Sequence, residues 1–113
     1  MFDKHSGTFV LVNATGSTIS NTSLTHTCSD FTNVLTVDSL AVGQASSTKP
    51  LNSKSGFNDY WTVSFDINGE TKTRNNKQCN MPNEDDLTCV IILYADDFSV
   101  ITPDNSPCTH NHY

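Results

Sequence analysis

The sequence has no long hydrophobic run. Its longest apolar stretches, such as residues 9–12 and 90–94, span only four or five residues. A secretory core region needs about 7–15 apolar residues and a membrane-spanning helix about 20, so we expect neither a targeting segment nor a membrane span. The chain is then either a processed product with an added Met or a protein that leaves the cell without a signal peptide.

Basic residues are also scarce. Lys and Arg total 6 against 12 Asp and Glu, which gives a net charge of −6 and an isoelectric point near 4.8. Nucleic acids and anionic membranes repel such a chain at long range, so we expect neither as a partner. Charged residues make only 16% of the sequence, and neutral Thr, Ser and Asn supply 40 of the 113 residues. A surface of hydroxyls and amides suits an uncharged polar ligand.

The length and the low apolar content limit the chain to one domain with a thin core. A chain of 113 residues is long enough for a single modest core but short of two. Apolar residues make 35% of it, below the roughly 45–50% of ordinary globular domains, a figure that also counts Gly. We expect one domain over residues 1–113, with loose termini over 1–6 and 109–113.

The four cysteines show no Cys-x-x-Cys spacing, which argues against a zinc site or a redox motif. Cys28, Cys79, Cys89 and Cys108 stand at long, irregular intervals. In an oxidising compartment so small a chain favours disulfides, and four cysteines allow three pairings. Two bridges are one expectation. Four buried or idle thiols are the other, if the protein stays in a cytosol.

No window shows the sustained 3.6-residue period of an amphipathic helix, and the local patterns favour strands. Residues 9–12 form a short apolar run that is typical of a strand covered on both faces. Residues 22–28 and 34–37 favour further strands. Residues 44–56 are either a loop or an edge strand, since Pro50 would prevent pairing onward.

The clearest local signal is a hairpin. Apolar and polar side chains alternate over residues 60–67, which predicts a strand with one face on the core. Asn68-Gly69 then favours a type I′ turn into a strand over 70–74, because both residues tolerate positive φ.

A second hairpin pairs residues 88–94 with 98–102, and Pro82 with its acidic neighbours favours a single helical turn within 79–86. Together these patterns predict a mainly β domain, an antiparallel two-layer sandwich with at most one short helix. A strand that is apolar on both faces needs cover on both sides, which a helix could supply in part. An α+β sandwich is therefore the alternative.

Catalytic constellations are absent from the sequence pattern. The available bases are His5, His26, His110 and His112. His26 and Cys28 would share one face of a strand, but such neighbours stand about 7 Å apart, too far for a direct hydrogen bond. His110 and His112 could bind a transition metal, and there we expect adventitious binding rather than a site. We expect a protein that is not an enzyme and has no metal site or cofactor.

Two acidic stretches, residues 84–86 and 96–97, offer oxygen ligands of the kind that calcium prefers. Neither has the alternating ligands and central Gly of a calcium loop, so we interpret both as solvated turns. The same carboxylates could serve as the acid and base of a glycosidase, which stand about 5 to 9 Å apart. A domain this small leaves little room for the deep cleft that such a reaction needs.

Sugar recognition fits the residue types better, because sugar sites combine hydrogen-bonding side chains with an aromatic ring that stacks on the sugar. The candidate carbohydrate-binding residues come from the two ends of the first hairpin: Asn58, Asp59, Tyr60, Arg74, Asn75 and Asn76. Positions whose numbers sum to about 137 pair across this hairpin, so Tyr60 lies opposite about Lys77 and the two sets meet. Trp61 then faces the core and Tyr60 faces outward. The alternative is that Tyr60 and Arg74 merely cover the outer sheet face.

The same stretch resembles a known family. The motif runs through Asp59-Tyr60-Trp61-Thr62-Val63-Ser64-Phe65, Asn68-Gly69 and Lys77-Gln78-Cys79-Asn80, with Glu84-Asp85 a few residues on. It is similar to small mushroom proteins that carry the "up-regulated in daf-2" type domain, and to the glycan-binding lectins and immunomodulatory proteins of fruiting bodies. The resemblance covers residues 7–108 in the order of strands and is specific only over 59–85. It implies a non-enzymatic sandwich used in defence or recognition, secreted or released from the fruiting-body cytosol without a conventional signal. It assigns no binding residue.

Two functions from different classes compete. The first is a lectin for neutral glycans or glycoproteins, with a homodimer as the expected form because valence multiplies weak single-site affinity. The second is a membrane-active, cytolysin-like defence protein, which needs an exposed aromatic patch or an amphipathic helix. A structural or storage protein is a third. Asn13-Ala14-Thr15 and Asn21-Thr22-Ser23 match glycosylation acceptors, which matter only on the secretory route.

Overall fold

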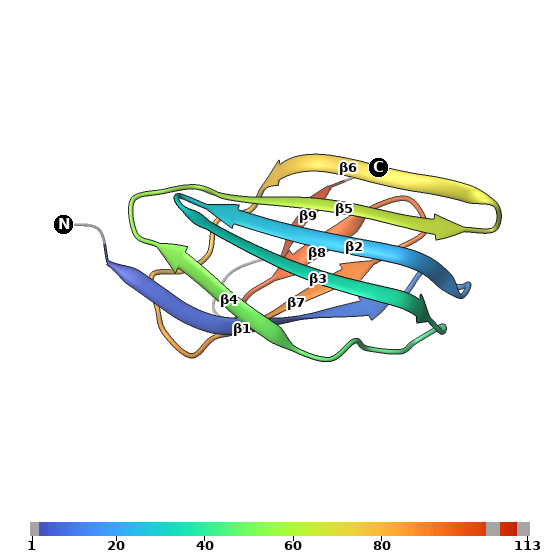
Figure 1. Ribbon diagram of the computed structural model, residues 1–113, viewed down its shortest axis with the longest axis horizontal. Coiled ribbons are helices and arrows are strands. Elements are labelled where there is room, and N and C mark those ends of the chain that lie inside the picture. The colour runs from blue at the N-terminus through green and yellow to red at the C-terminus, as the bar shows by residue number, and fades with distance from the viewer. Residues whose placement is uncertain (1–2, 104–106, 111–113) are drawn as a thin grey trace.

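The chain forms two β-sheets that pack face to face (Figure 1). The computed structural model describes residues 3–103 and 107–110, of which 109 and 110 are described by their backbone alone. In chain order the strands are β1 (Lys4–Asn13), β2 (Ile19–Cys28), β3 (Phe31–Leu40), β4 (Lys49–Lys54), β5 (Asp59–Ile67), β6 (Glu70–Gln78), β7 (Thr88–Leu93), β8 (Phe98–Ile101) and β9 (Cys108–His110). Within these residues there is no helix of the length and apolarity that a membrane crossing requires.

One sheet has the strand order β4-β1-β7-β8-β9 and the other the order β3-β2-β5-β6. Neighbouring strands run antiparallel except for β1 and β7, which are parallel. In Figure 1 the four-stranded sheet lies in front of the strands β1, β7, β8 and β9. This arrangement confirms the mainly β two-layer sandwich and decides against the α+β alternative.

The core lies between the inner faces of the two sheets. In β5, Trp61, Val63 and Phe65 are wholly buried and alternate with residues that face outward, as the sequence pattern predicts. The Trp61 ring packs edge-on against Phe9 of β1, with 6.1 Å between ring centres, and so joins the two sheets. Each large apolar side chain buried in this way contributes about 1.5–3 kcal/mol.

The β5–β6 hairpin has the predicted turn. Asn68 and Gly69 adopt φ angles of 50° and 81°, which confirms the type I′ geometry. Further from the turn the register shifts between Val63 and Trp61, because β6 accommodates an extra residue as a bulge. Tyr60 therefore lies opposite Gln78, one residue beyond the position expected from a regular hairpin.

Strands reach further toward both ends of the chain than the sequence predicts. β1 begins at Lys4, within the segment 1–6 that was expected to be loose. The C-terminal region contains β9, which pairs antiparallel with β8 and includes two residues of the expected loose end 109–113. The remaining residues of that end, 111–113, lie outside the described part of the chain.

Between the two hairpins, residues 79–86 form bends and no helical turn. The stretch 44–56 contains β4, an edge strand that includes Pro50, which matches the edge-strand interpretation.

The two sides of the sandwich are closed by different means. On one side a disulfide between Cys79 and Cys108 joins the end of β6 to β9. On the other side Asn52 of β4 donates a hydrogen bond from Nδ2 to Oδ1 of Asn33 in β3, at 3.3 Å. The remaining cysteines, residues 28 and 89, are free and buried. One bridge therefore forms instead of two, and the other two cysteines fit the buried-thiol alternative.

Residues 9–12 are apolar on both faces, but only the inner face is covered. Phe9 and Leu11 point into the core and are fully buried, whereas Val10 and Val12 lie on the outer face of the five-stranded sheet and are half-buried. In the described part of the chain no helix or third layer packs on that outer face. The expectation of cover on both faces is therefore wrong for this strand.

Candidate functional site

The first half of the predicted binding set lies where β5 begins. Tyr60 is on the outer face of the four-stranded sheet with 36% of its surface exposed, and Asn58 is exposed beside it. Asn58 Nδ2 donates to the Tyr60 hydroxyl at 3.5 Å, and Asn58 Oδ1 accepts from Asn80 Nδ2 at 3.2 Å. Asp59, between them, is buried. The flanking residues are open to a ligand, and Asp59 is not.

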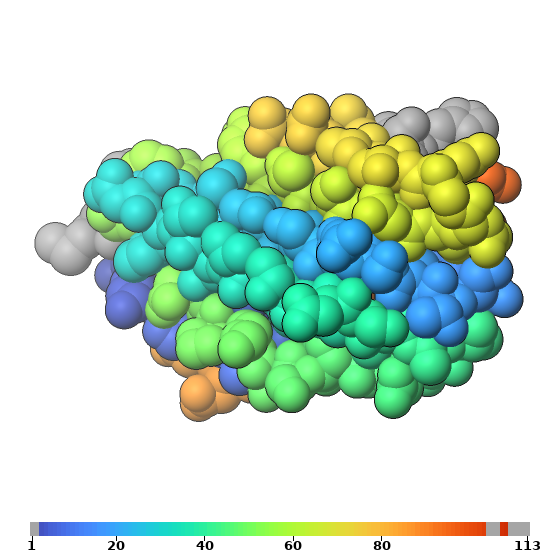
Figure 2. All heavy atoms as spheres, turned by 45° about the vertical axis from the view of Figure 1, so that its right-hand side comes forward, coloured from blue at the N-terminus to red at the C-terminus, as the bar shows by residue number. Residues whose placement is uncertain are grey.

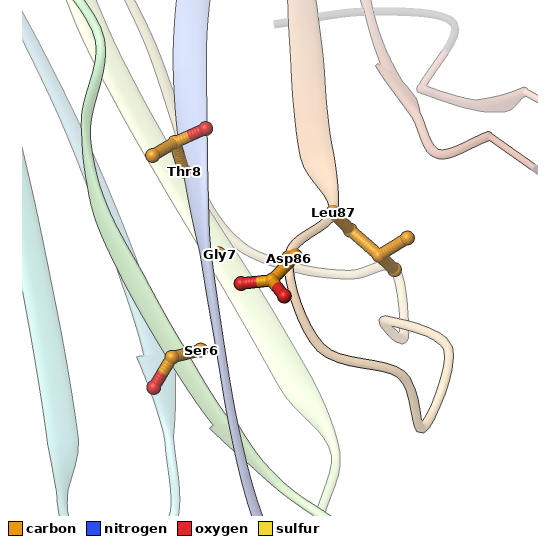
Figure 3. Close-up of a pocket in the computed structure, with 5 residues that line it drawn as sticks. All are labelled: Ser6, Gly7, Thr8, Asp86 and Leu87. Carbon is orange, nitrogen blue, oxygen red and sulfur yellow. The ribbon is translucent and has the colours of Figure 1, made fainter.

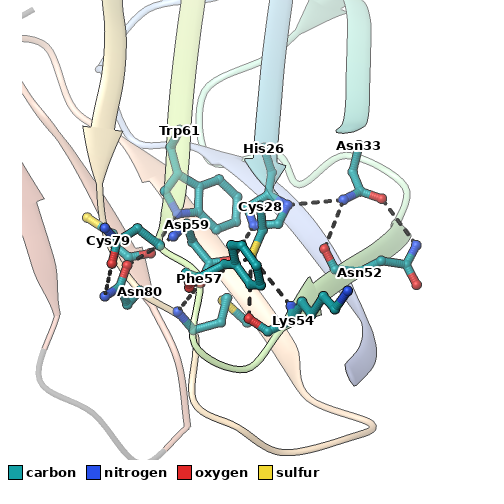
Figure 4. A network of polar contacts seen from close by, with 12 residues as sticks. His26, Cys28, Asn33, Asn52, Lys54, Phe57, Asp59, Trp61, Cys79 and Asn80 are labelled. Atoms are coloured by element: carbon teal, nitrogen blue, oxygen red, sulfur yellow. Dashed lines mark hydrogen bonds and ion pairs between the residues drawn. The ribbon is translucent and has the colours of Figure 1, made fainter. Parts of the chain in front are cut away.

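Asp59 belongs to a buried polar network, shown in Figure 4. Its Oδ1 lies 2.6 Å from Nε2 of His26, and both side chains are almost wholly buried. Its Oδ2 accepts a hydrogen bond from the backbone N–H of Met81 at 2.8 Å. The amide of Asn33 can only donate from Nδ2, so it assigns the acceptor role to Nδ1 of His26, at 3.0 Å. Both Asp59 oxygens are engaged inside the protein, which corrects its place in the ligand-binding set.

The same network fixes the strand end that carries Tyr60. The rings of His26 and Trp61 lie 4.6 Å apart. Trp61 Nε1 donates to the carbonyl oxygen of Cys79 at 2.9 Å, next to the disulfide. A buried polar network whose members are paired is rigid. The start of β5, which carries Tyr60, is therefore held in a fixed position.

The second half of the predicted set lies elsewhere. Arg74 pairs with Val63 and so points to the inner side of the sheet, whereas Tyr60 points outward. Its Nε is buried and has no hydrogen-bond partner in the described part of the chain. Lys72 and Lys77 share this inner side of β6. Arg74 therefore does not meet Tyr60, which corrects the prediction that the two sets join.

Asn75 and Asn76 form the bulge in β6. Asn76 adopts a φ of 52°, and its backbone N–H donates to Thr62 Oγ1 at 3.0 Å. Both side chains are exposed at the free edge of the sheet, but the residue opposite Tyr60 is Gln78. The bulge places both asparagines opposite Thr62, so Asn76 is displaced by one row from the position beside Trp61 that a regular hairpin would give it.

A shallow depression opens beside Tyr60. It encloses about 340 Å³ and is lined by Thr27, Cys28, Ser29, Gly56, Phe57, Asn58 and Tyr60. Two exposed aromatic side chains, Phe57 at 40% and Tyr60 at 36%, stand among hydroxyls and an amide. The Lys54 ammonium lies 5.6 Å from the centre of the Phe57 ring. Apolar rings beside donors and acceptors are the combination that sugar recognition requires.

The outer face of the four-stranded sheet carries a field of hydroxyl groups that leads to this depression. We call it the hydroxyl face, and its Ser and Thr residues are Ser20, Ser23, Thr25, Thr27, Thr32, Thr36, Ser39, Thr62, Ser64, Thr71 and Thr73. Cross-strand pairing places them side by side, as with Thr25 and Thr62 or Ser64 and Thr73. Figure 2 shows β3 and β2 crossing this side of the molecule in neighbouring bands, with β5 and β6 beyond them. Thr27 belongs to both the face and the depression.

Asp66 stands at the far end of the hydroxyl face. Asn21 Nδ2 and Thr71 Oγ1 donate to its carboxylate at 2.8 and 2.6 Å. These hydrogen bonds favour the charged form and hold the pKa of Asp66 below its ordinary value. Asn21 is also exposed, whereas Asn13 is wholly buried. Of the two glycosylation acceptors in the sequence, only Asn21 is accessible in the folded chain.

A cluster beside the β4–β5 loop has the outline of a hydrolytic triad. His5 Nε2 lies 2.7 Å from Ser55 Oγ, and its Nδ1 lies 3.4 Å from a carboxylate oxygen of Asp85. The second separation is within ion-pair range, but Nδ1 has no hydrogen-bond partner among residues 3–103 and 107–110. A working triad needs that bond, which orients the ring and stabilises its charged form. The geometry therefore indicates that His5 links β1 to two loops and does not activate Ser55 as a nucleophile.

Figure 3 shows another depression, of about 250 Å³, between β1 and the loop that precedes β7. Ser6, Thr8 and Asp86 supply its polar groups. Gly7 is required there, because a Cβ on it would stand 2.3 Å from the carbonyl oxygen of Leu87. The exposed acidic stretch 84–86 is thus a turn packed against β1.

No group of three or more His, Cys, Asp or Glu side chains in the described ranges could hold an ion. The side chain of His110 and the whole of His112 lie outside those ranges.

The sequence alone points to Asn58 and Tyr60 but not to Phe57, Thr27 or Ser29. Phe57 comes from the β4–β5 loop, Thr27 from the end of β2 and Ser29 from the turn after it. The long-range pairing of β2 with β5 brings these segments together. Alternating hydroxyl residues over 23–27 were the available signal, since they indicate a strand with one polar face.

The comparisons with known proteins add no family to this geometry. No protein-family model matches the chain, and no curated protein is significantly similar to it.

Proposed function

We propose that the protein is a lectin that binds neutral glycans at the depression around Phe57 and Tyr60, with the hydroxyl face as an extension of the site. The observation that carries this proposal is the pair of exposed aromatic rings set among the Asn58 amide and the hydroxyls of Thr27 and Ser29. A sugar presents an apolar ring face and a fan of hydroxyls, and the depression offers a partner for each.

The size and charge of the site favour a neutral, extended ligand. A volume of about 340 Å³ is at the low end of the range for ligand pockets, roughly 300–1,000 Å³. One sugar unit would therefore bind in the depression and further units would lie on the hydroxyl face. The net charge of −6 disfavours acidic sugars at long range.

Each predicted residue has a revised role in this proposal. Asn58 and Tyr60 contact the ligand. Asp59 is a positioning residue, since it fixes the strand end from inside the network with His26. Arg74, with Asn75 and Asn76, lies outside the depression.

The resemblance to mushroom fruiting-body proteins supports a role in fungal defence or immunomodulation. Such a role uses recognition without catalysis, in keeping with a site that has aromatic rings, amides and hydroxyls as its working groups.

A glycan array followed by calorimetry tests the proposal. We expect wild-type protein to bind a neutral oligosaccharide and the Tyr60→Ala variant to bind it about two- to twelvefold more weakly, because stacked aromatic rings contribute about 0.5–1.5 kcal/mol beyond their buried area. Tyr94→Ala is the matched control, since Tyr94 is equally exposed at 38% but does not line the depression. Arg74→Ala should stay within about twofold of wild type. A wild-type protein that retains no neutral glycan would overturn the proposal, as would full binding by the Tyr60→Ala variant.

A second candidate function is that of a membrane-active protein. Two contacts at the same end of the sandwich favour it. The Lys4 ammonium lies 5.4 Å from the Phe31 ring centre, and that of Lys54 lies 5.6 Å from the Phe57 ring centre. Aromatic and ammonium groups together suit a bilayer interface. Dye release from neutral phosphatidylcholine vesicles that is lost in the Phe57→Ala variant would promote this candidate, and absence of release would remove it.

A further inference from the structure

The hydroxyl face divides into two halves, which differ in whether their hydroxyl groups are already bonded. Over β5 and β6 the hydroxyls take part in hydrogen bonds within the protein. Ser64 Oγ and Thr73 Oγ1 lie 3.1 Å apart. Thr71 Oγ1 donates to Asp66 at 2.6 Å, and Thr62 Oγ1 accepts from a backbone N–H at 3.0 Å. A ligand on this half would have to compete with these bonds.

Over β2 and β3 the hydroxyls are free. Five of them lie next to one another and are half-buried or exposed, and we call them the hydroxyl ring: Ser23, Thr25, Thr27, Thr32 and Thr36. In the part of the chain that the structure describes, their side chains make no hydrogen bond. They can therefore donate to a ligand and accept from it without giving up a bond inside the protein.

The hydroxyl ring surrounds Val34 of β3, which is 51% exposed. Thr25 lies directly opposite Val34 on β2. Two members of the ring, Thr32 and Thr36, flank Val34 on its own strand at about 7 Å. The other two are its diagonal neighbours on β2, at about 7–8 Å. An apolar side chain among free hydroxyls repeats, on a smaller scale, the combination found at Tyr60.

We propose that Val34 and the hydroxyl ring form a second sugar subsite, which holds the continuation of a neutral, linear oligosaccharide whose first unit lies in the depression at Tyr60. This inference rests on the proposed function. Thr27 links the two subsites, because it lines the depression and also belongs to the ring. The glycan therefore runs across β2 toward β3 and leaves the β5–β6 half of the hydroxyl face unoccupied.

The chemistry of this subsite favours a sugar over a protein or a charged ligand. Val34 and the hydroxyl ring carry no charge. A specific protein interface buries about 800 Å² on each partner around an apolar core, whereas the apolar part of this subsite is a single valine. One valine suits the apolar face of one sugar ring, and the surrounding hydroxyls suit the hydroxyls at the edge of that ring.

Calorimetric titration with two probes tests the proposal: a single-unit glycoside and a four-unit chain of the neutral glycan that the array selects. We expect the wild-type protein to bind the four-unit chain more tightly than the single unit. Val34→Lys covers the second subsite and should weaken binding of the four-unit chain about three- to tenfold, the effect of losing one or two buried methyl contacts. Binding of the single unit should stay within about twofold. Val42→Lys is the matched control, since Val42 is 56% exposed in the turn after β3 and lies outside the hydroxyl ring.

Two threonines at opposite ends of one row provide a second comparison. Thr36 of β3 and Thr73 of β6 lie in the same cross-strand row, and both are exposed. Thr36→Val removes a free hydroxyl and should weaken binding of the four-unit chain about two- to tenfold. Thr73→Val removes the hydroxyl that is paired with Ser64 and should stay within about twofold of wild type. Both variants keep a β-branched side chain at an exposed strand position, so both should fold.

Equal affinity of the wild type for the two probes would overturn the second subsite. So would a four-unit chain whose binding Thr73→Val weakens more than Thr36→Val does, because the glycan would then follow β5 and β6. Tyr60→Ala separates these results from a failure of the proposed function. If it weakens binding of the single unit while the Val34 and Thr36 variants bind the four-unit chain like wild type, the lectin proposal stands and the second subsite is wrong. If the wild type binds neither probe, both proposals are overturned.

Discussion

His26 and Asp59 form a buried pair at the base of the proposed binding site, with 2.6 Å between Nε2 and Oδ1. Removing one partner leaves the other without its hydrogen bond in a place that water does not reach. We expect Asp59→Ala to lower the free energy of unfolding by about 3–5 kcal/mol. Urea denaturation measures this change. Asp38→Ala, at an exposed position of β3, is the control and should change stability by less than about 0.5 kcal/mol. Equal stability of the two variants would refute a structural role for the pair.

Gly7 and Leu87 approach too closely for any side chain at residue 7. Because a Cβ there would meet the backbone oxygen of Leu87 at 2.3 Å, Gly7→Ala must push β1 and β7 apart where they begin to pair. We expect a loss of at least about 2 kcal/mol, measured by thermal or urea unfolding. Ser6→Ala, the neighbouring exposed position, should have little effect. A Gly7→Ala variant as stable as Ser6→Ala would show that the two backbones separate freely.

The disulfide between Cys79 and Cys108 spans 29 residues, and closing a loop of that length in the unfolded chain contributes about 3–4 kcal/mol. The double variant Cys79→Ser with Cys108→Ser should lose about this much stability in urea denaturation. Wild-type protein with a reducing agent should behave in the same way. Stability that is unaffected by either change would mean that the bridge does not constrain the unfolded chain.

The free thiols should be inert in the folded protein. Burial raises the pKa of Cys89 to about 12 and also raises that of Cys28, so both thiols remain protonated at pH 8 and unreactive toward a disulfide reagent. In urea two thiols per chain should react. Rapid labelling of the native protein would contradict this.

The same pKa shift makes a prediction for alkaline pH. The folded state keeps the Cys89 thiol neutral up to about pH 12, whereas the unfolded chain loses this proton near the ordinary pKa of 9.0. The contribution of the neutral thiol to stability is therefore fully present below pH 9.0 and is lost as pH rises toward about 12. Unfolding by urea should therefore become easier over that interval. A Cys89→Ala variant should show a smaller dependence on pH there.

The row formed by Ser55, His5 and Asp85 should show no hydrolase reactivity. Because His5 Nδ1 is not hydrogen-bonded to Asp85, the ring is not held as a base for Ser55. We expect a fluorophosphonate probe to label wild-type protein no more than the Ser55→Ala variant. Labelling that depends on Ser55 would instead reveal an esterase-like site.

Local sequence signals predict the strands and their turns well. Alternation over residues 60–67 and the Asn68-Gly69 turn give the β5–β6 hairpin, because both depend on neighbours in the chain. The parallel pairing of β1 with β7 and the short strand β9 depend on partners far away in the sequence. No local pattern specifies them, and the C-terminal residues 109–113 were therefore expected to be loose.

The binding site could be predicted only in part for the same reason. Tyr60 faces outward because its strand alternates, and the sequence shows that alternation. Asp59 obeys the same alternation and points inward, where it meets His26 of β2, a contact that depends on the fold. Arg74 was misplaced although its register is the regular one: it pairs with Val63, so it lies on the inner side of the sheet and not on the outer side with Tyr60. The bulge lies beyond it, and a bulge of exposed polar residues leaves no clear mark in the sequence.

The inward-pointing cations of β6 have a consequence for how the protein behaves when crowded. β6 is a nine-residue strand at the edge of its sheet, and no other strand of the described residues pairs with its outer edge. Further chains can be added to an edge of this kind to build fibrils. Lys72, Arg74 and Lys77 all lie on its inner side, so a strand docking there would trap three positive charges against the apolar interior. The addition of further strands along this edge is thereby disfavoured.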